Sequence, residues 1–135
     1  MAFIEWSNSL SVGLAEIDDQ HRRLIGLINR LSEVSEAGEA PASVSAALGE
    51  LESYVATHFA LEEGYFDRFQ YPAAKEHKAE HLAFAQRVAS LKAEFLAGKS
   101  GLSRELLPFL RSWLTNHIAF SDRKYKPLFA QKGVR

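Results

Sequence analysis

Residues 24–31 read Leu-Ile-Gly-Leu-Ile-Asn-Arg-Leu, and this stretch predicts an amphipathic helix. Its apolar side chains, continued by Val34, recur three and four positions apart, which places them on one face of an α-helix. We expect this helix to run from about Asp18 to Ala37, with Gly38 marking its end. The stretch therefore favours an all-α fold.

Three further segments have the same helical spacing of apolar residues. We expect helices over residues 41–69 and 72–97, and a fourth that starts after Gly101, reaches about Phe120 and can continue towards Phe129. The connecting segments are short, and short connections make consecutive helices antiparallel neighbours. The sequence therefore predicts an up-down-up-down antiparallel four-helix bundle.

The beginning of the chain and one proline depart from this pattern. Residues 1–17 contain apolar side chains without helical spacing, so we expect an N-terminal arm that packs against a bundle formed by residues 18–132. Pro108 has no backbone N–H and disrupts a helix interior, so it suits the fourth helix only if that helix starts about one turn earlier. Without a repeat or a linker, residues 1–135 are expected to form a single domain.

The composition narrows the classes of function. The 135 residues carry a formal net charge of -1 and a pI near 6.5, so nucleic acids and anionic membranes are poor partners. The chain has no cysteine, which excludes disulfides and thiolate ligands and leaves nitrogen and oxygen donors for any metal. No segment resembles a signal peptide or approaches the ~18 apolar residues of a membrane span. We therefore expect a cytoplasmic monomer without membrane insertion.

The 5 histidines are distributed over the four expected helices as one, one, two and one. Each lies on or beside the apolar face of its helix, where a polar ring needs a partner. A single inward-facing histidine is most often a hydrogen-bonded core residue, but a set spread over four helices is hard to explain in that way. The set is His21, His58, His77, His81 and His117.

Two spacings among the candidate ligands are typical of metal sites. His77 and His81 are four positions apart, and so are His58 and Glu62, so each pair presents its side chains on one helical face. Glu63, the neighbour of Glu62, is interpreted as an ordinary surface charge. These two pairs predict a metal site without any reference to other proteins.

Asp122 is the doubtful member of the set. It follows His117 by five positions, which at about 100° per residue turns it about 140° away from that histidine. It can therefore join the site only through a frayed or widened turn. Five imidazoles and two carboxylates are too many ligands for one ion and suit two, and such donors bind iron, zinc, copper or manganese. A ferritin-type centre needs Glu-x-x-His motifs, and no histidine here has a glutamate three positions before it.

Several of these stretches together resemble the hemerythrin family, and most closely its single-domain bacterial members, over essentially the whole chain. Residues 6–7 and 10–13 also resemble the N-terminal arm of that family. The stretches are 18–21 (Asp-Asp-Gln-His), 58–63 (His-Phe-Ala-Leu-Glu-Glu), 71–72 (Tyr-Pro), 77–81 (His-Lys-Ala-Glu-His), 113–118 (Trp-Leu-Thr-Asn-His-Ile) and Asp122. In hemerythrins the last histidine is followed by four residues and then a bridging aspartate, and Asp122 occupies that position.

The resemblance implies a cofactor of two iron ions (Fe2+/Fe3+) joined by an oxo or hydroxo bridge. By the same resemblance, Glu62 and Asp122 would bridge the two irons. One iron would be filled by three histidines, and the other would have two histidines and an open position for dioxygen. The three are His77, His81 and His117, and the two are His21 and His58.

An apolar oxygen pocket is expected beside the open position. Ordinary core packing accounts for most of the role of its members, and the resemblance adds a ligand-binding role. From the first two helices they are Leu24, Ile25 and Phe59, and from the fourth helix Trp113, Leu114 and Ile118.

The resemblance implies reversible dioxygen binding for storage, transport or delivery, with an oxygen-requiring enzyme as one recipient. Since the expected pocket contains no obvious general acid or base, we expect a carrier and not an enzyme. Two alternatives stay open at this point. One is a sensor of oxygen, redox or iron status that acts through a partner, and the other is a di-iron oxidase or peroxidase.

Overall fold

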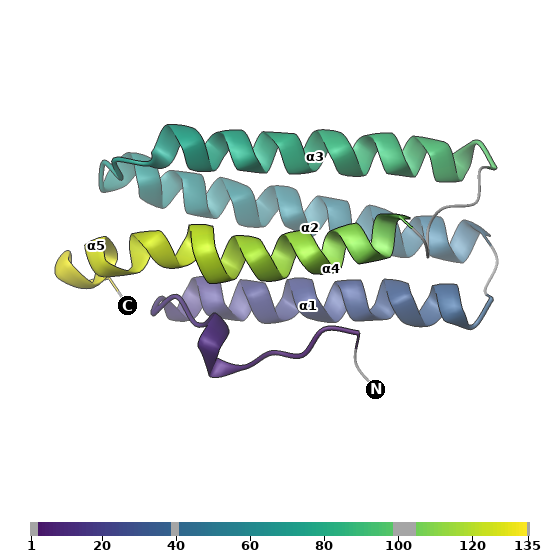
Figure 1. Cartoon of the computed structure of the whole chain (residues 1–135), viewed down its shortest axis with the longest axis horizontal. Coiled ribbons are helices and arrows are strands. Elements are labelled where there is room, and N and C mark those ends of the chain that lie inside the picture. The colour runs from purple at the N-terminus through teal and green to yellow at the C-terminus, as the bar shows by residue number, and fades with distance from the viewer. Residues whose placement is uncertain (1–2, 39–40, 99–104, 135) are drawn as a thin grey trace.

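Four antiparallel helices form a bundle in the computed structural model, which describes residues 3–38, 41–98 and 105–134 (Figure 1). The predicted fold class is confirmed. The chain continues beyond the fourth helix through three short helical segments of different pitch. The four helices are α1 (Ala15–Glu36), α2 (Pro41–Arg68), α3 (Ala74–Leu96) and α4 (Leu107–Asn116). The three segments are a π-helical turn (His117–Ser121), a 3-10 turn (Asp122–Tyr125) and α5 (Lys126–Gln131).

Some helix boundaries differ from those expected. α1 begins at Ala15 instead of near Asp18, because the Asp18 carboxylate accepts hydrogen bonds from Ser11 Oγ (2.6 Å) and from the backbone N–H of Val12 (2.9 Å). These bonds join the arm to the first turn of α1. α3 begins at Ala74 and leaves Pro72 in the preceding turn.

The remaining boundary predictions concern glycines and a proline. Gly38 follows the end of α1 with a positive φ of 68°, a conformation that glycine adopts without strain, as expected for a helix end. α4 begins at Leu107, so Pro108 lies in its first turn, where no N–H is required. The expected start after Gly101 and the connectors 39–40 and 99–104 lie outside the described residues.

The N-terminal arm is fastened along α1. The Asn29 side chain mimics a peptide group: its Oδ1 accepts the N–H of Ile4 at 2.7 Å, and its Nδ2 donates to the Ile4 carbonyl at 2.9 Å. The Arg22 guanidinium lies 4.5 Å from the centre of the Trp6 ring. Val12 is fully buried, so the arm contributes to the core of the bundle.

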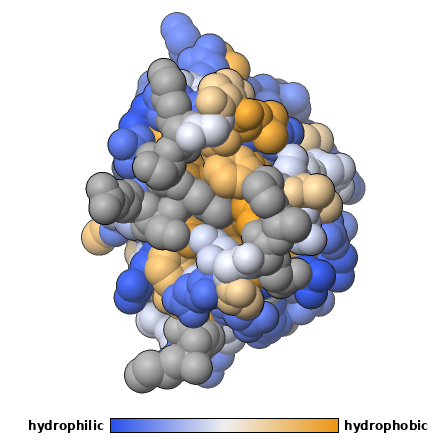
Figure 2. Space-filling view, turned by 90° about the vertical axis from the view of Figure 1, so that its right-hand side faces the viewer, coloured by the Kyte–Doolittle hydropathy of each residue, from blue (hydrophilic) through white to orange (hydrophobic). Residues whose placement is uncertain are grey.

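The interior of the bundle has two unlike halves. Towards the end where α1 and α3 finish, it is filled by aliphatic side chains such as Leu31, Leu48 and Leu110. Figure 2 shows this end, with apolar residues near the middle of the face and hydrophilic residues around them. Towards the other end, buried histidines and carboxylates replace the aliphatic residues. Within the described residues, no helix combines the length and apolar character needed to cross a bilayer.

Candidate metal centre

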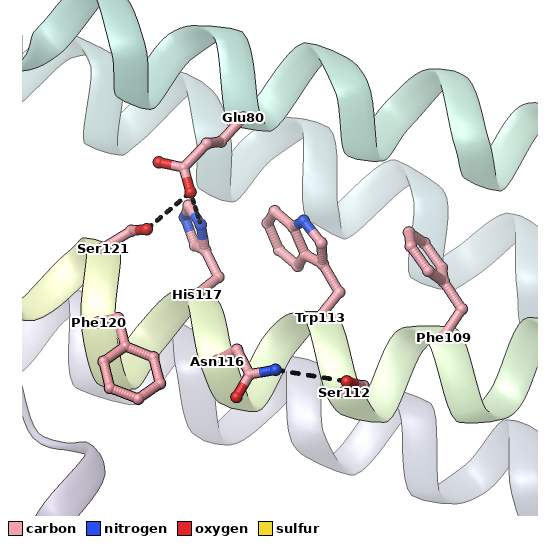
Figure 3. A pocket seen from close by; sticks show the side chains of 8 residues that line it. All are labelled: Glu80, Phe109, Ser112, Trp113, Asn116, His117, Phe120 and Ser121. Atoms are coloured by element: carbon pink, nitrogen blue, oxygen red, sulfur yellow. Dashed lines mark hydrogen bonds and ion pairs between the residues drawn. The ribbon is translucent and has the colours of Figure 1, made fainter.

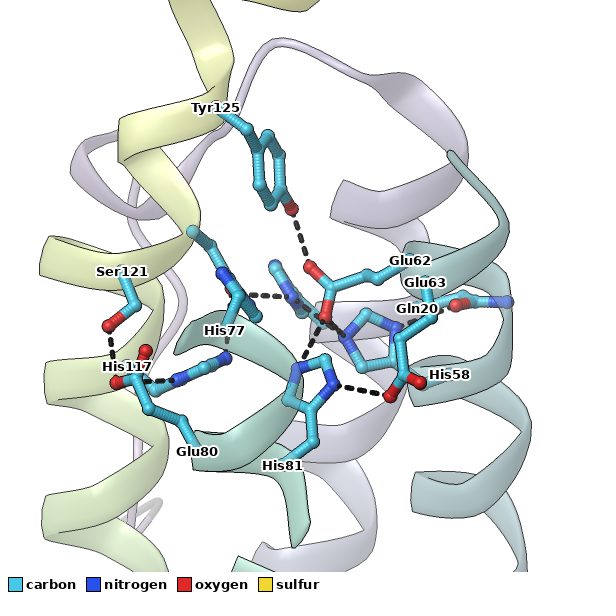
Figure 4. A network of polar contacts seen from close by, with 12 residues as sticks. Gln20, His58, Glu62, Glu63, His77, Glu80, His81, His117, Ser121 and Tyr125 are labelled. Carbon is cyan, nitrogen blue, oxygen red and sulfur yellow. Dashed lines mark hydrogen bonds and ion pairs between the residues drawn. The ribbon is translucent and has the colours of Figure 1, made fainter. Parts of the chain in front are cut away.

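The structure brings all the predicted ligands together in the polar half of the bundle (Figure 4). Their side chains are buried, with exposed fractions of 0 to 5%. Their donor atoms form two groups, and within each group the atoms lie within 4.8 Å of one another. One group is Glu62, His77, His81, His117 and Asp122, and the other is His21, His58, Glu62 and Asp122. The two carboxylates belong to both groups.

Asp122 divides its two oxygens between the groups. Its Oδ2 lies 3.1 Å from His21 Nε2, whereas its Oδ1 lies 2.9 Å from His77 Nε2 and 3.0 Å from His117 Nε2. A carboxylate in this position can offer one oxygen to each of two cations. The spacing argument alone did not place Asp122 here.

The π-helical turn at His117–Ser121 explains how Asp122 reaches the site. The backbone N–H of Asp122 donates to the carbonyl of His117, five residues back, as in a π-helix. Five residues therefore fill approximately one turn, and the side chains of His117 and Asp122 face the same way. This is the widened turn that the five-residue spacing required.

Glu62 lies between one histidine of each group. Its Oε1 is 3.2 Å from His58 Nε2 and 3.3 Å from His81 Nε2. Its Oε2 accepts a hydrogen bond of 2.6 Å from the hydroxyl of Tyr125, which is fully buried. Tyr125 thus holds the second oxygen of Glu62 in place, a role that the sequence did not indicate.

Most of the donor atoms face shared points, although Nε2 of His21 and Nε2 of His58 also lie within hydrogen-bond distance of each other, at 3.1 Å. Although the N···O distances are short, several of these buried atoms make no hydrogen bond within the described part of the chain. Their lone pairs are therefore left without a proton to accept, which is costly in a dry core. A cation at each shared point would satisfy them, so the donor set fits metal binding. The atoms are Glu62 Oε1, both Asp122 oxygens, and Nε2 of His77, His81 and His117.

The electrostatics of the cluster favour charged carboxylates. Burial and the Asp122 charge both raise the pKa of Glu62, but the His58 imidazole outweighs them and lowers that pKa to about 2. Burial likewise opposes ionisation of Asp122, and His117 overcomes it, so the pKa of Asp122 is well below its usual range. Burial lowers the pKa of His58, yet Glu62 raises it overall. Two negative charges are thus held inside the bundle, where cations would balance them.

Two of the histidines have partners on their outer nitrogens that sequence reasoning missed. His81 Nδ1 lies 2.9 Å from Glu63 Oε2, so Glu63 is not merely a surface charge. His58 Nδ1 lies 2.7 Å from Gln20 Oε1. Partners of this kind fix the orientation of a metal-binding imidazole and the nitrogen that faces the metal. The sequence offered one clue to these partners, namely that they are adjacent to proposed ligands: Gln20 precedes His21, and Glu63 follows Glu62.

A third outer partner lies at the surface between α3 and α4. Glu80 Oε1 is 3.7 Å from His117 Nδ1 and accepts a hydrogen bond of 2.7 Å from Ser121 Oγ. These residues border an open pocket of about 410 Å³ along α4, which Figure 3 shows together with Trp113 and Phe120. Glu80 therefore connects His117 to the outside of the bundle.

Comparison with known proteins agrees with this geometry. Residues 12–129 match the family model described as the hemerythrin HHE cation binding domain. The chain belongs to the hemerythrin family. The matched range contains every residue of both donor groups, so the cation-binding description applies to the part of the chain that carries the cluster.

Named hemerythrins resemble the chain in both sequence and structure. It is 38% identical to a bacteriohemerythrin of Stenotrophomonas maltophilia over 93% of this chain and 80% of that one. It is 32% identical to a bacteriohemerythrin of Methylococcus capsulatus over 94% and 97%, respectively. A crystal structure of wild-type hemerythrin superposes with a TM-score of 0.87 at 30% identity and covers 93% of this chain and 97% of that one.

The expected pocket residues of this hemerythrin domain are all in the interior or at its edge. Leu24, Ile25, Leu114 and Ile118 are buried in the apolar core. The rings of the two aromatic members contact imidazoles of the larger donor group. Phe59 stacks on His81 with ring centres 3.7 Å apart and lies 6.0 Å from His58, and Trp113 stacks on His117 at 4.2 Å. The contact of Phe59 with His58 agrees with the expected position of that ring, whereas Trp113, also expected near His21 and His58, stacks on His117 of the larger group.

Proposed function

We propose that this hemerythrin domain binds dioxygen reversibly at a centre of two iron ions. The observation that supports the proposal most directly is the asymmetry of the donor groups: three histidines face one shared point and two face the other, while both carboxylates face both points. The proposed ligands are His21, His58, Glu62, His77, His81, His117 and Asp122.

The unequal histidine count gives the two metal positions different chemistry. Three histidines and two shared carboxylates would fill most of the coordination shell of one ion, whereas two histidines would leave room at the other for an external ligand. We assign the open position to the ion held by His21 and His58. Iron in this setting would supply the electrons that reversible binding of dioxygen requires.

The protein's own part is to orient, to balance charge and to exclude water. Glu62 and Asp122 would offset part of the charge of two divalent ions, and each histidine is fixed by its helix. Leu24, Leu114 and Ile118 keep the surroundings of the centre apolar. A dry, apolar environment limits the entry of water, and therefore favours release of dioxygen as dioxygen over loss of a reduced product.

The test uses an iron-loaded, chemically reduced sample that is prepared anaerobically and then exposed to oxygen. A carrier develops a visible charge-transfer absorption on oxygenation and loses it under argon through repeated cycles. A sample that never forms such an adduct would refute the proposal. Multiple turnovers of added peroxide by the same sample would instead support a peroxidase and contradict a carrier.

A further inference from the structure

An apolar cavity of about 100 Å³ lies between α2 and α3, on the aliphatic side of the metal centre. Ala56 of α2 and Ala85 of α3 both line it. Neither side chain extends beyond Cβ, so the contact between the two helices is left incompletely filled. The deeper walls are buried aliphatic residues, among them Leu51, Val88 and Leu110.

The inner wall of this cavity includes two aromatic rings, and one of them, Phe59, contacts proposed metal ligands. Phe59 and Phe84 line the cavity and pack edge to face, with ring centres 5.7 Å apart. The Phe59 ring also stacks on His81 and lies 6.0 Å from His58. A single side chain therefore separates the cavity from a histidine of each donor group.

The outer edge of the cavity is lined by small side chains and one charged side chain. Ala56 and Ala85 are exposed to solvent, and Glu52 contributes the charged group among the lining residues. Lys92 of α3 holds Glu52 of α2 in an ion pair of 2.8 Å, with both side chains about one-third exposed. The ion pair keeps the carboxylate at the rim, so the interior of the cavity is apolar.

We propose that this cavity takes up a small apolar molecule of the size of dioxygen and admits it to the metal centre past Phe59. The identity of the molecule rests on the proposed function. A water molecule in a protein interior needs two to four polar partners, and the lining residues offer one polar side chain, Glu52, at the outer edge. Apolar cavities of about 150 Å³ stay dry and bind xenon or benzene. The cavity thus selects dioxygen over water.

Xenon is a direct probe of the cavity, because it binds in apolar cavities and needs no reaction at the metal. Crystals of the iron-loaded protein under xenon pressure are expected to show xenon between α2 and α3, beside Phe59. Ala85→Leu fills the opening and is expected to remove that xenon. Ala83→Leu is the matched control, since Ala83 is exposed on the same helix and does not line the cavity.

Dioxygen kinetics test the route. Ala85→Leu is expected to slow both dioxygen association and dissociation about fivefold, with affinity nearly unchanged, because a blocked path raises one barrier for both directions. Ala83→Leu should keep the wild-type rates. Ala56→Leu blocks the opening from the facing helix and is expected to repeat the effect if Ala85→Leu folds poorly.

The outcomes separate this inference from the proposed function. A dioxygen adduct in a protein with no xenon in the cavity would overturn the inference and leave the proposed function intact. Bound xenon with unchanged rates in both plugged variants would also overturn it. Bound xenon in a protein that forms no dioxygen adduct would reject the proposed function, and the route with it.

Discussion

The two donor groups differ most in the side chains that contact the outer nitrogens and the ring faces of their histidines. In the larger group, carboxylates face the outer nitrogens of His81 and His117, and an aromatic ring stacks on each imidazole. In the smaller group, His58 faces the neutral amide of Gln20. The Nδ1 of His21 is buried and has no hydrogen-bond partner among the described residues.

This difference has a direct consequence for metal affinity. A carboxylate behind an imidazole raises its basicity and strengthens its bond to a metal, while an amide only orients it. We therefore expect the three-histidine side to hold its ion firmly and the two-histidine side to hold its ion weakly. The weaker side is also the one to which we assign the open coordination position, so the more reactive ion would also be the more weakly bound one.

Removing a carboxylate that both donor groups share should abolish metal binding on both sides, and with it the difference in affinity between them. Glu62→Ala is expected to abolish binding of both ions and to lower stability by about 3–5 kcal/mol, because the buried imidazoles lose a negative partner. Iron per protein and the urea midpoint measure the two effects. Glu50→Ala, an exposed glutamate on the same helix, is the control. Iron content near that of the wild type would refute the ligand assignment.

Exchanging the partners of the outer histidine nitrogens should reduce the difference in metal affinity between the two sides. Glu63→Gln removes the carboxylate from His81 and is expected to weaken metal binding on the three-histidine side about 10–100-fold. Gln20→Glu supplies a carboxylate to His58 and should strengthen the other side. Stepwise metal release to a chelator measures both. An unchanged order and rate of release in both variants would show that these partners do not set the affinity.

Enlarging the proposed oxygen pocket should increase the difference between the two sides. Leu114→Ala is expected to speed autoxidation several-fold by admitting water, at a stability cost of about 2–5 kcal/mol. Leu31→Ala is the matched control, since Leu31 is also buried but belongs to the aliphatic half. Autoxidation that accelerates equally in both variants would point to general loosening and exclude a local role for Leu114.

Proton binding should give the smallest effect, and the iron-free protein is where it can be seen. The lowered pKa of Glu62 stabilises the folded state above pH 4.5, and this stabilisation is lost as the pH falls towards 2. The raised pKa of His58 stabilises the folded state below pH 6.5, and this stabilisation is lost as the pH rises through the pKa that His58 has in the folded protein. Urea midpoints of the iron-free protein should therefore be highest between these limits. A midpoint that rises steadily from pH 5 to 8 would contradict this.

The sequence predicted the fold and the independent ligand pairs for a clear physical reason. Helical periodicity depends on local spacing alone, and it places His77 with His81 and His58 with Glu62 whatever the rest of the chain does. The packing of these pairs against one another needed the bundle, whose short connections were also readable. The boundaries near Ala15 and Ala74 depended on the hydrogen bonds of Asp18 and on the turn at Pro72, which spacing does not encode.

Other features of the centre could not be obtained from spacing. Asp122 requires a change of helical pitch that no propensity predicts, and only the family resemblance indicated it. Glu63, Glu80 and Tyr125 act through contacts between helices, so their roles depend on side-chain positions in the folded protein. The division into three and two histidines was likewise implied by the family resemblance alone, because it depends on how four helices are placed together.

The π-helical turn between His117 and Asp122 also bears on changes in chain length. It stores one residue more than an α-helical turn needs, so removing one residue from 118–121 would leave a spacing of four, the spacing that joins His58 to Glu62. Such a deletion can be absorbed by closing the turn. An insertion has no such outlet, and it would rotate Asp122, Tyr125 and Phe129 together by about 100°. This segment should therefore tolerate shortening and resist lengthening.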